Sequence, residues 1–254
     1  MAVQSVDRAL DVLEALAEAG KPQGVGELAA RTGLPQGTAH RILQSLQERG
    51  YVRRDGSRKY SLGTSAVRLA DGAQRALARS ARPYLAELVT LSGETANLAV
   101  REGDDVVYIA QVSSPHTLRM FAEVGRHVPP HSTAVGKVLL AALPREEARA
   151  ILRRTGLAPR TDATITDLAA FEAELDLVAA QGWAADEEEQ EAGVRCVAVP
   201  VGGPGPTLAA MSLSGPADRF AGGRVEGLVE AMRHVGQAFG AGSPPQQVAD
   251  RVAD

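Results

Sequence analysis

The sequence contains one cysteine, Cys196, in 254 residues. A single thiol can form neither an internal disulfide nor a zinc site built from several cysteines, so we expect no such cross-link in the fold. No apolar run approaches the roughly 18 residues that a membrane-spanning helix needs. Asp7 and Arg8 stand where the apolar segment of a secretory signal would lie. We therefore expect a cytoplasmic protein that makes no membrane contact.

Signatures of common catalytic sites are also missing. The sequence has no Gly-x-Ser-x-Gly elbow, no P-loop and no strand-to-helix Gly-x-Gly-x-x-Gly. Cys196 lies in an apolar segment, where burial raises the pKa of a thiol and lowers its reactivity. His127 and His131 are four residues apart, but Pro129 and Pro130 prevent the helix that would direct both at one metal. The sequence therefore predicts no enzyme, no cofactor and no metal site.

Acidic and basic residues are unevenly distributed. The chain has a formal net charge of −4, which by itself argues against nucleic acid as a partner. Residues 1–70 nevertheless hold ten Lys and Arg against seven Asp and Glu, a net charge of +3, which leaves −7 for the remainder. A basic head on an acidic body indicates that only the head meets a polyanion. With 44% hydrophobic residues, the chain can build two domains.

Residues 1–63 have the pattern of three helices followed by a β-hairpin. Apolar periodicity, with Ser5 as the first N-cap and Pro35 in the first turn of the third helix, predicts helices over 6–19, 26–31 and 35–50. Alternating residues about Asp55-Gly56-Ser57 predict strands over 51–54 and 59–62. Helix, helix, tight turn, helix and hairpin is the order of a winged helix-turn-helix, in which the hairpin is the wing.

The third predicted helix has an apolar stripe that must pack against the first two helices. The stripe is formed by Ala39, Ile42, Leu43 and Leu46. Arg41 and Gln44 lie on the opposite face and are long enough to read base edges in a major groove, whereas Thr38 at the helix start suits a phosphate. The residues of this helix that we expect at DNA are Gln36, Gly37, Thr38, His40, Arg41, Gln44 and Ser45.

The predicted wing is basic. Residues 49–59 hold five Lys and Arg against Asp55, a balance that suits the sugar-phosphate backbone. The wing residues that we expect at DNA are Arg53, Arg54, Arg58 and Lys59. Arg58 lies beside the turn, where it can enter a narrow minor groove. Charged outer faces are ordinary on amphipathic helices, and a winged helix can also bind protein, so the interpretation depends on the combination of features.

The rest of the chain predicts a mixed second domain. Residues 64–91 have a helical pattern with a break near Pro83, which indicates a linker helix over 64–80 and a second domain over 81–240. The expected strands of this domain cover 95–101, 106–112, 195–201 and 208–214, and its later helices 133–143, 145–155, 167–181 and 224–239. Residues 241–254 are rich in Gly, Pro, Gln and Asp and predict a disordered tail.

Several segments resemble the IclR family of bacterial regulators. They are 5–10 (SVDRAL), 33–43 (GLPQGTAHRIL), 60–63 (YSLG), 130–137 (PHSTAVGK), 186–189 (DEEE) with Gly193, 196–201 (CVAVPV) and 212–216 (SLSGP). The resemblance covers nearly the whole chain up to the tail. It implies an α+β protein with an N-terminal winged helix-turn-helix, a linker helix and a C-terminal GAF-like α/β effector-binding and oligomerisation domain. The chain departs from the family at Gly37, where serine is common, and at Pro129-Pro130, which stiffens the expected pocket rim.

The expected effector site combines residue chemistry with this resemblance. Ser132 or Thr133 can cap the helix that contains Gly136, and the free N–H groups of such a helix start attract a carboxylate. Asp186 favours a ligand that also carries a hydrogen-bond donor. By resemblance, the site is formed by the backbone of Ala134 and Val135, the side chains of Asp186, Cys196, Ser212 and Ser214, and an apolar wall of Leu118 and Met120.

Each of these residues also has a structural interpretation. A cysteine in an apolar strand is usually a small core residue, and Ser212 and Ser214 can satisfy neighbouring backbone groups. Lys137 near a helix start is more often structural or solvated than ligand-binding. The acidic run predicts a solvated turn; it consists of Glu187, Glu188, Glu189 and Glu191.

The leading hypothesis is a transcription regulator, more often a repressor, that binds a palindromic double-stranded operator. The resemblance implies homodimers, often paired into tetramers, and one small organic acid per subunit. Glyoxylate, pyruvate, ureides such as allantoate and aromatic acids are the candidate effectors. Two alternatives stay open: an enzyme that acts on a small acid and uses the head for localisation, and an architectural DNA-binding protein without a ligand.

Overall fold

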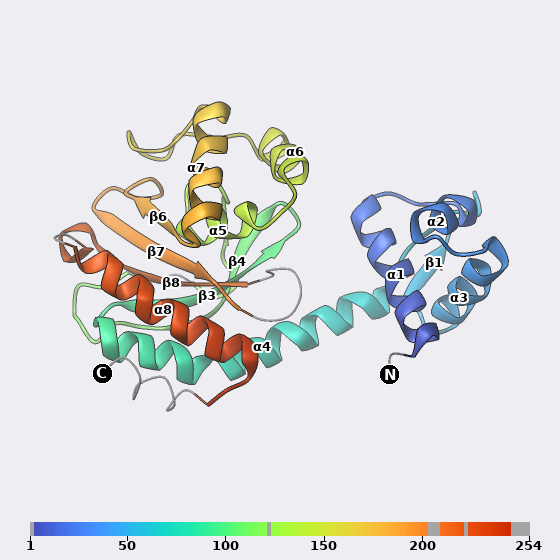
Figure 1. Cartoon of the computed structure of the whole chain (residues 1–254), viewed down its shortest axis with the longest axis horizontal. Helices are drawn as coiled ribbons and strands as arrows, with labels where there is room; N and C mark the ends of the chain where they lie inside the picture. Colours follow the sequence, from blue (N-terminus) through green and yellow to red (C-terminus); the bar gives the residue numbers. More distant parts are fainter. Residues whose placement is uncertain (1–2, 121–122, 203–208, 221–222, 245–254) are drawn as a thin grey trace. The chain divides into compact units, whose positions relative to one another are not determined.

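The computed structural model describes residues 3–120, 123–202, 209–220 and 223–244. The chain divides into two compact units, Met1–Ala76 and Leu77–Asp254 (Figure 1). Each unit has its own hydrophobic core. Of the predicted disordered tail, residues 245–254 lie outside the described part, whereas Ala241 ends the last helix. No helix in the described part combines the length and the apolar character that a membrane crossing requires.

The first unit contains three helices and a hairpin. They are α1 (Gln4–Ala19), α2 (Val25–Thr32), α3 (Gln36–Glu48), β1 (Val52–Arg54) and β2 (Tyr60–Leu62). Its core is formed by Val12, Ala15, Leu16, Leu28, Leu43, Val52 and Tyr60. Gly20 and Gly33 end α1 and α2 with φ of 59° and 65°, a left-handed conformation that glycine adopts without steric cost. The order of elements confirms the predicted helix-turn-helix with a hairpin behind it.

Several predicted boundaries in this unit were wrong. Ser5 is not the N-cap of α1, because the helix already begins at Gln4 after Val3. Pro35 is itself the N-cap of α3 rather than a residue of its first turn. Lys59 lies in the hairpin turn, where its N–H is bound by the Asp55 carboxylate, so β2 begins one residue later than predicted. These shifts of one or two residues follow from local hydrogen bonds that apolar periodicity does not report.

The second unit is built on one antiparallel sheet of six strands in the order β5-β4-β3-β8-β7-β6. The strands are β3 (Thr95–Glu102), β4 (Asp105–Val112), β5 (His127–Val128), β6 (Ala184–Glu187), β7 (Val194–Pro200) and β8 (Ala209–Pro216). The helix α4 (Thr64–Ser92) begins in the first unit and ends in the second. The other helices of the second unit are α5 (Ala134–Ala141), α6 (Arg145–Thr155), α7 (Leu168–Gln181), the short 3₁₀ helix η1 (Ala217–Phe220) and α8 (Arg224–Ala241). These elements confirm an α/β domain with an antiparallel sheet.

The two faces of this sheet have different coverings. On one face, Leu98, Met211 and Leu213 pack with Leu85 of α4 and Met232 of α8 in the larger apolar core. The other face packs against α5 through small residues and also carries polar side chains. Side chains alternate between faces along each strand, so residues two apart, such as 95, 97 and 99 of β3, share the second face.

The predicted helix break at Pro83 was wrong. The helix α4 runs without interruption from Thr64 to Ser92 with Pro83 inside it. Proline removes one helical hydrogen bond, but Pro83 is exposed, so the carbonyl left without a partner can turn toward water. Tyr84, Leu85 and Leu88 are buried on the other side and hold the helix against the core. Tertiary packing therefore outweighs the local penalty.

Two short edge strands, β5 and β6, were not predicted. Both are too short and too polar to give a periodic signal, and they form by pairing with β4 and β7. The predicted cap of α5 was confirmed, because Thr133 Oγ1 accepts the N–H of Gly136 at 3.3 Å. A Cβ at Gly136 would lie 2.2 Å from the carbonyl oxygen of Pro130, so only glycine fits there. That close approach places the start of α5 against the segment before it.

Candidate functional site

The outer face of α3 is exposed as the predicted stripe requires. Ala39 and Leu43 are fully buried and Ile42 and Leu46 pack against the same core. Thr38 is half-buried at the helix start. The remaining predicted contact residues of the helix are exposed: Gln36, Gly37, His40, Arg41, Gln44 and Ser45. A Cβ at Gly37 would meet nothing within 4 Å, so no packing demand explains the glycine.

A surface groove runs beside α3 and reaches α1. It is lined by Ser5, Arg8, Ala9, Thr38, Arg41, Ile42, Ser45, Leu46 and Arg49. Three guanidinium groups and three hydroxyl groups therefore border one groove, a combination that suits phosphate oxygens. Ser5, Arg8 and Arg49 were not among the predicted contact residues. The signal was available, because Ser5 and Arg8 are three residues apart and so share one face of α1.

The wing is held in shape by its own acid. Asp55 Oδ1 accepts the hydroxyl of Ser57 at 2.7 Å and the N–H groups of Ser57 and Lys59 at 2.9 Å. These hydrogen bonds, the one from the Ser57 hydroxyl foremost, lower the pKa of Asp55. Arg58 has φ of 64°, a left-handed conformation that is uncommon for a residue with a side chain. The acid thus fixes a tight turn that presents Arg58 at its tip.

The other wing arginines are oriented by neighbours on β2. Arg53 Nε donates to Ser61 Oγ at 2.9 Å, and the guanidinium of Arg54 lies 5.4 Å from the centre of the Tyr60 ring. A cation over an aromatic face is attracted by the ring quadrupole. Arg53, Arg54, Arg58 and Lys59 are all exposed. The wing therefore presents four cations from a short, internally braced hairpin.

The second unit contains a cavity of about 50 Å³ on the polar face of its sheet. Its lining residues are Thr95, Asn97, Tyr108, Met120, Arg126, Val128, Thr133, Asp186, Gln190, Glu191, Val194, Cys196 and Ser214. Four of the predicted effector residues thus come together: Met120, Asp186, Cys196 and Ser214. They arrive from β6, β7, β8 and the segment after β4.

The other four predicted effector residues do not line this cavity. Leu118 is 73% exposed, and its carbonyl accepts a hydrogen bond from Arg219. Ala134 and Val135 are buried in the apolar cluster beneath α5. Ser212 is buried on β8, two residues before Ser214, and its hydroxyl accepts a hydrogen bond from Asn97 Nδ2 at 3.3 Å. For Leu118 and Ser212 the segment match could not say which way the side chain points, and for Ala134 and Val135 the backbone contact stays a prediction.

A row of polar side chains crosses the sheet under the cavity. Gln111 Nε2 donates to Asn97 Oδ1 at 3.0 Å, and Asn97 Nδ2 donates to the hydroxyls of Ser212 and Ser214 at 3.3 Å. Strand register continues the row, because Ser214 pairs with Cys196 and Cys196 pairs with Asp186. Each buried amide or hydroxyl in the row has a partner, as burial requires.

Thr95, Asn97 and Tyr108 of this site were not predicted from the sequence. A signal existed in β3, where the polar Thr95 and Asn97 alternate with the apolar Ala96 and Leu98. Such alternation marks a strand with one polar face, but it does not say that this face is buried. Arg126, Gln190 and the capping residue Thr133 were also not assigned to the cavity.

Asp186 is the acid of the cavity. Its side chain is 2% exposed, and Oδ1 accepts the N–H groups of Glu189 at 2.7 Å and Gln190 at 3.3 Å. Burial raises the pKa of Asp186 to about 7, against the lowering effect of those hydrogen bonds. Burial likewise raises the pKa of Cys196 and of Tyr108. At neutral pH the thiol and phenol are therefore neutral, and Asp186 can either donate or accept a hydrogen bond.

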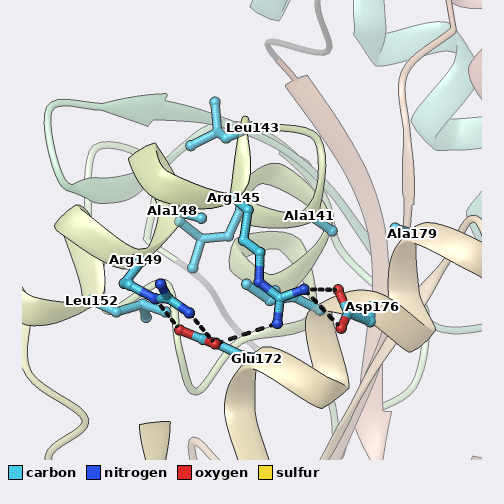
Figure 2. A pocket seen from close by; sticks show the side chains of 11 residues that line it. Ala141, Leu143, Arg145, Ala148, Arg149, Leu152, Glu172, Asp176 and Ala179 are labelled. Atoms are coloured by element: carbon cyan, nitrogen blue, oxygen red, sulfur yellow. Dashed lines mark hydrogen bonds and ion pairs between the residues drawn. The ribbon is translucent and has the colours of Figure 1, made fainter. Parts of the chain in front are cut away.

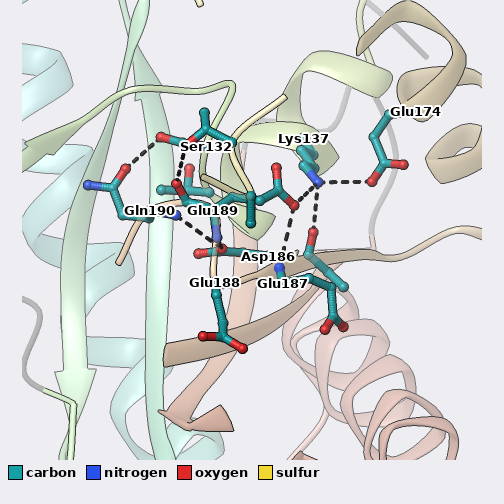
Figure 3. A network of polar contacts seen from close by, with 12 residues as sticks. Ser132, Lys137, Glu174, Asp186, Glu187, Glu188, Glu189 and Gln190 are labelled. Carbon is teal, nitrogen blue, oxygen red and sulfur yellow. Dashed lines mark hydrogen bonds and ion pairs between the residues drawn. The ribbon is translucent and has the colours of Figure 1, made fainter. Parts of the chain in front are cut away.

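The predicted solvated turn was wrong for Glu189. Its side chain is 5% exposed and bonds the ammonium group of Lys137 (Figure 3). Lys137 is buried as well, so of its two predicted roles the structural one holds and the solvated one does not. Glu187 and Glu191 are exposed, as predicted. Opposite charges 52 residues apart in sequence pair here, which no local pattern could report.

A second depression lies between α6 and α7. Arg149 and Glu172 form a two-point ion pair at 2.5 and 2.7 Å, and Arg145 bonds both oxygens of Asp176 at 3.2 Å (Figure 2). The hydrogen bonds from Arg149 lower the pKa of Glu172 to about 2. Because these charged groups already pair with one another, we interpret the ion pairs as structural links between α6 and α7 and not as a ligand site.

No metal site is formed by the residues that the structure describes, since no three His, Cys, Asp or Glu side chains converge there. The Nε2 atom of His131 lies 3.0 Å from the carbonyl oxygen of Ala158, and burial lowers the pKa of its ring. His127 instead lies beside Glu102 and Asp105 on the surface. The two histidines thus have separate surroundings.

Known proteins resemble this chain along both units. A family model described as the IclR helix-turn-helix domain matches residues 5–56, and one described as the C-terminal part of bacterial transcriptional regulator IclR matches residues 73–240. The HTH-type transcriptional regulator KdgR of Escherichia coli strain K12 is 40% identical over 236 residues, which cover 91% of this chain and 89% of that protein.

Two further proteins share nearly the full length. The transcriptional repressor IclR of Escherichia coli strain K12 is 34% identical over 248 residues, 94% of this chain and 90% of its own. The crystal structure of an IclR homolog from Microbacterium hydrocarbonoxydans, solved in complex with 4-hydroxybenzoate, is 27% identical with a TM-score of 0.61. It covers 93% of this chain and 98% of that one.

Proposed function

The chain belongs to the IclR family of bacterial transcriptional regulators, and on that premise we propose that it is a repressor released or retuned by a small organic acid. The proteins that match it regulate transcription and are not enzymes, which agrees with the predicted lack of an enzymatic role. The single observation that carries the proposal is that one chain combines an exposed polar helix face and a basic wing with a buried polar cavity.

The DNA-binding mode follows from exposure and charge. We place α3 in a major groove, where Arg41 and Gln44 read base edges, and the wing on the flanking backbone. Arg8 and Arg49, which line the groove beside α3, add phosphate contacts. Phosphate contacts fix register and orientation, and the two long side chains of α3 supply sequence preference.

Apolar side chains on the first unit support a dimer. Val3, Val6 and Leu10 are exposed on one side of α1, and Val67 and Leu69 are exposed on α4. Burying such residues against a second copy is favourable. We propose a homodimer of heads on a palindromic operator, with 64–80 as the linker helix and residues 81–240 binding the effector and pairing dimers into tetramers. A regulator of this kind works in the cytoplasm, where its DNA is.

The cavity chemistry supports a carboxylate effector with a second polar group. Arg126 and Thr133 line the cavity, and Thr133 caps the start of α5. A cation and a helix N-terminus are therefore available to the carboxylate of an effector bound there. Asp186 and the Asn97 row offer hydrogen bonds to a hydroxyl, carbonyl or amide. The bound 4-hydroxybenzoate of the Microbacterium hydrocarbonoxydans protein has both kinds of group. We therefore retain glyoxylate, pyruvate, allantoate and aromatic hydroxy acids as candidates.

Regulation requires only a difference in affinity. An effector that binds the DNA-incompetent arrangement better by about 1.4 kcal/mol lowers operator affinity tenfold. The test is a thermal-shift screen of the four acid classes on the full chain, followed by DNA-binding titration with and without each hit. A ligand that stabilises the protein and weakens operator binding supports the proposal. If no acid stabilises the protein while specific DNA binding persists, the cavity is not an acid sensor.

A further inference from the structure

Lys137 lies in α5 with its side chain 1% exposed, which lysines tolerate only when their charge is paired. Its Nζ donates to Glu189 Oε1 at 2.5 Å, Glu174 Oε1 at 2.9 Å and the carbonyl of Ala185 at 3.0 Å (Figure 3). An ammonium group has three N–H donors, so all three are used. Lys137 does not line the cavity. All hydrogen bonds of the Lys137 ammonium group therefore go to groups of the protein, and none is left for a ligand.

Two of its three acceptors flank the cavity acid. Ala185 directly precedes Asp186, and Glu189 follows it by three residues. The carboxylate of Asp186 in turn accepts the N–H groups of Glu189 and Gln190, so acid and turn support each other. Glu188 within the turn has φ of 63°, a conformation that a residue with a side chain keeps only when its surroundings impose it.

The backbone of the turn is anchored on its other side by hydroxyl groups. Thr161 Oγ1 donates to the carbonyl of Glu188 at 2.7 Å, and Thr164 Oγ1 donates to that of Glu189 at 2.7 Å. Ser132 Oγ donates to Gln190 Oε1 at 2.5 Å. None of these groups carries charge. Within the described part of the chain, Lys137 is the cation in ion-pair distance of Glu189.

Loss of the ammonium group would leave the Glu189 carboxylate buried without a counter-charge. Breaking a buried pair at one partner is costly, because the remaining charge has lost its solvation and its partner. Glu189 can relieve this by taking up a proton, which burial already favours because it raises the pKa of Glu189, or by moving toward water. In either case the turn loses its bond to the Lys137 ammonium group. Asp186 and Gln190 line the cavity and belong to the same turn, so both are then free to move.

We propose that Lys137 is a positioning residue of the effector cavity, because its ammonium group holds the turn 186–190 closed and so places Asp186 and Gln190 before a ligand. The functional meaning rests on the proposed effector role of the cavity, but the arrangement can be tested without any ligand. The competing explanation is purely structural: Lys137 ties α5 to α7 through Glu174, and the turn keeps its shape without it.

The titration of Asp186 reports the charge that the ion pair places near the cavity acid, whereas the exchange rate of the turn separates the two explanations. Lys137 and Glu189 act on it from α5 and from its own turn, and Cys196 of β7 and Tyr108 of β4 face it from the sheet. Arg126 and Glu191 line the same cavity. The ammonium of Lys137 lowers the pKa of Asp186 and the carboxylate of Glu189 raises it. Removing one or the other should therefore shift the midpoint in opposite directions.

The experiment uses the full chain without ligand and compares Lys137→Met with Glu174→Gln. Glu174→Gln removes the other carboxylate of the same ammonium and leaves the turn intact, so it is the matched control. Hydrogen exchange measured by mass spectrometry reports on residues 184–191, and carbon-13 NMR of labelled aspartate, assigned with Asp186→Asn, reports the titration. For Lys137→Met we expect about tenfold faster exchange in the turn and a midpoint raised by about one unit.

Glu174→Gln should leave both readings as in the wild type. Wild-type exchange of the turn in folded Lys137→Met, with or without a shifted midpoint, or equal effects of the two variants on exchange, would overturn the proposal. If Lys137→Met does not fold, Glu189→Gln decides: faster exchange in the turn with a lowered midpoint supports the positioning role, and no change in either refutes it. A failed effector screen would leave these results standing and remove only their link to ligand binding.

Discussion

The two units carry their functional residues in opposite ways. In the first unit, Arg41, Gln44 and the wing cations are exposed to solvent, where they can contact DNA. In the second, Asn97 and Asp186 are buried and already bonded to neighbouring groups. An exposed contact residue costs the fold little, whereas a buried polar group must be satisfied even without ligand. Single substitutions can therefore change the DNA preference without loss of stability. A substitution in the cavity leaves a buried hydrogen-bond partner unsatisfied unless its neighbours change as well.

The largest expected effect tests the exposed side of this comparison. Replacing Arg41 and Gln44 by alanine should weaken binding to an operator, selected from random duplexes with the wild-type protein, by roughly a thousandfold, about 4 kcal/mol for two base contacts. The free energy of unfolding should stay within about 0.5 kcal/mol, because neither side chain is buried. Fluorescence anisotropy and urea unfolding measure the two quantities.

Gln47→Ala is the control, because Gln47 is exposed on α3 and is not among the residues that we expect at DNA. It should leave operator affinity within about twofold, in line with a solvated surface residue. If the double variant still selects the operator, α3 is not the reading helix. If it loses stability together with affinity, the separation of function from fold in the head is wrong.

The same contrast explains what sequence alone could predict. On α3, burial of Ala39 and Leu43 and exposure of Arg41 and Gln44 follow from a helical period within one segment. The wing turn follows from Asp55-Gly56-Ser57 in the same local way. Such features depend on residues a few positions apart, so the sequence carries them directly.

The cavity depends instead on partners that are distant in sequence. Asn97 reaches Ser214, 117 residues away, only because β3 pairs with β8. Lys137 meets Glu189 across 52 residues, and that contact turned a predicted solvated glutamate into a buried one. Resemblance supplied Asp186 and Cys196, but the orientation of Leu118, Ala134 and Val135 required the strand register and the packing of α5. Register is a property of the folded sheet and not of one segment.

The second prediction tests the buried side through pH. Asp186 has a pKa of about 7 in the folded protein, against the ordinary aspartate value of 3.8, so the folded state binds its proton more tightly. Its contribution to stability is complete below the unfolded value and is lost as pH rises through 7. Relative to Asp186→Asn, the wild type should therefore lose about 2 kcal/mol of unfolding free energy between about pH 5 and pH 7.

Urea unfolding of both proteins across this range measures the difference. Asp218→Asn is the control, because Asp218 is exposed on η1 and its loss should leave the pH profile of the wild type in place. A parallel profile for wild type and Asp186→Asn would mean that the acid titrates normally in the folded chain. The cavity would then hold a fixed negative charge and would favour cationic ligands over acids.

The smallest expected effect on DNA binding concerns the groove beside α3, which is lined by the half-buried Arg8 and the exposed Arg49. If Arg8 and Arg49 contact phosphates, Arg8→Ala and Arg49→Ala should each reduce the slope of log affinity against log salt by about 0.9. Phosphates carry no sequence information, so operator and random duplex should weaken equally. Arg31→Ala is the control, because Arg31 pairs with Glu18 on another surface of the unit. Equal slopes in all three variants would remove Arg8 and Arg49 from the DNA contacts and limit the DNA surface to α3 and the wing.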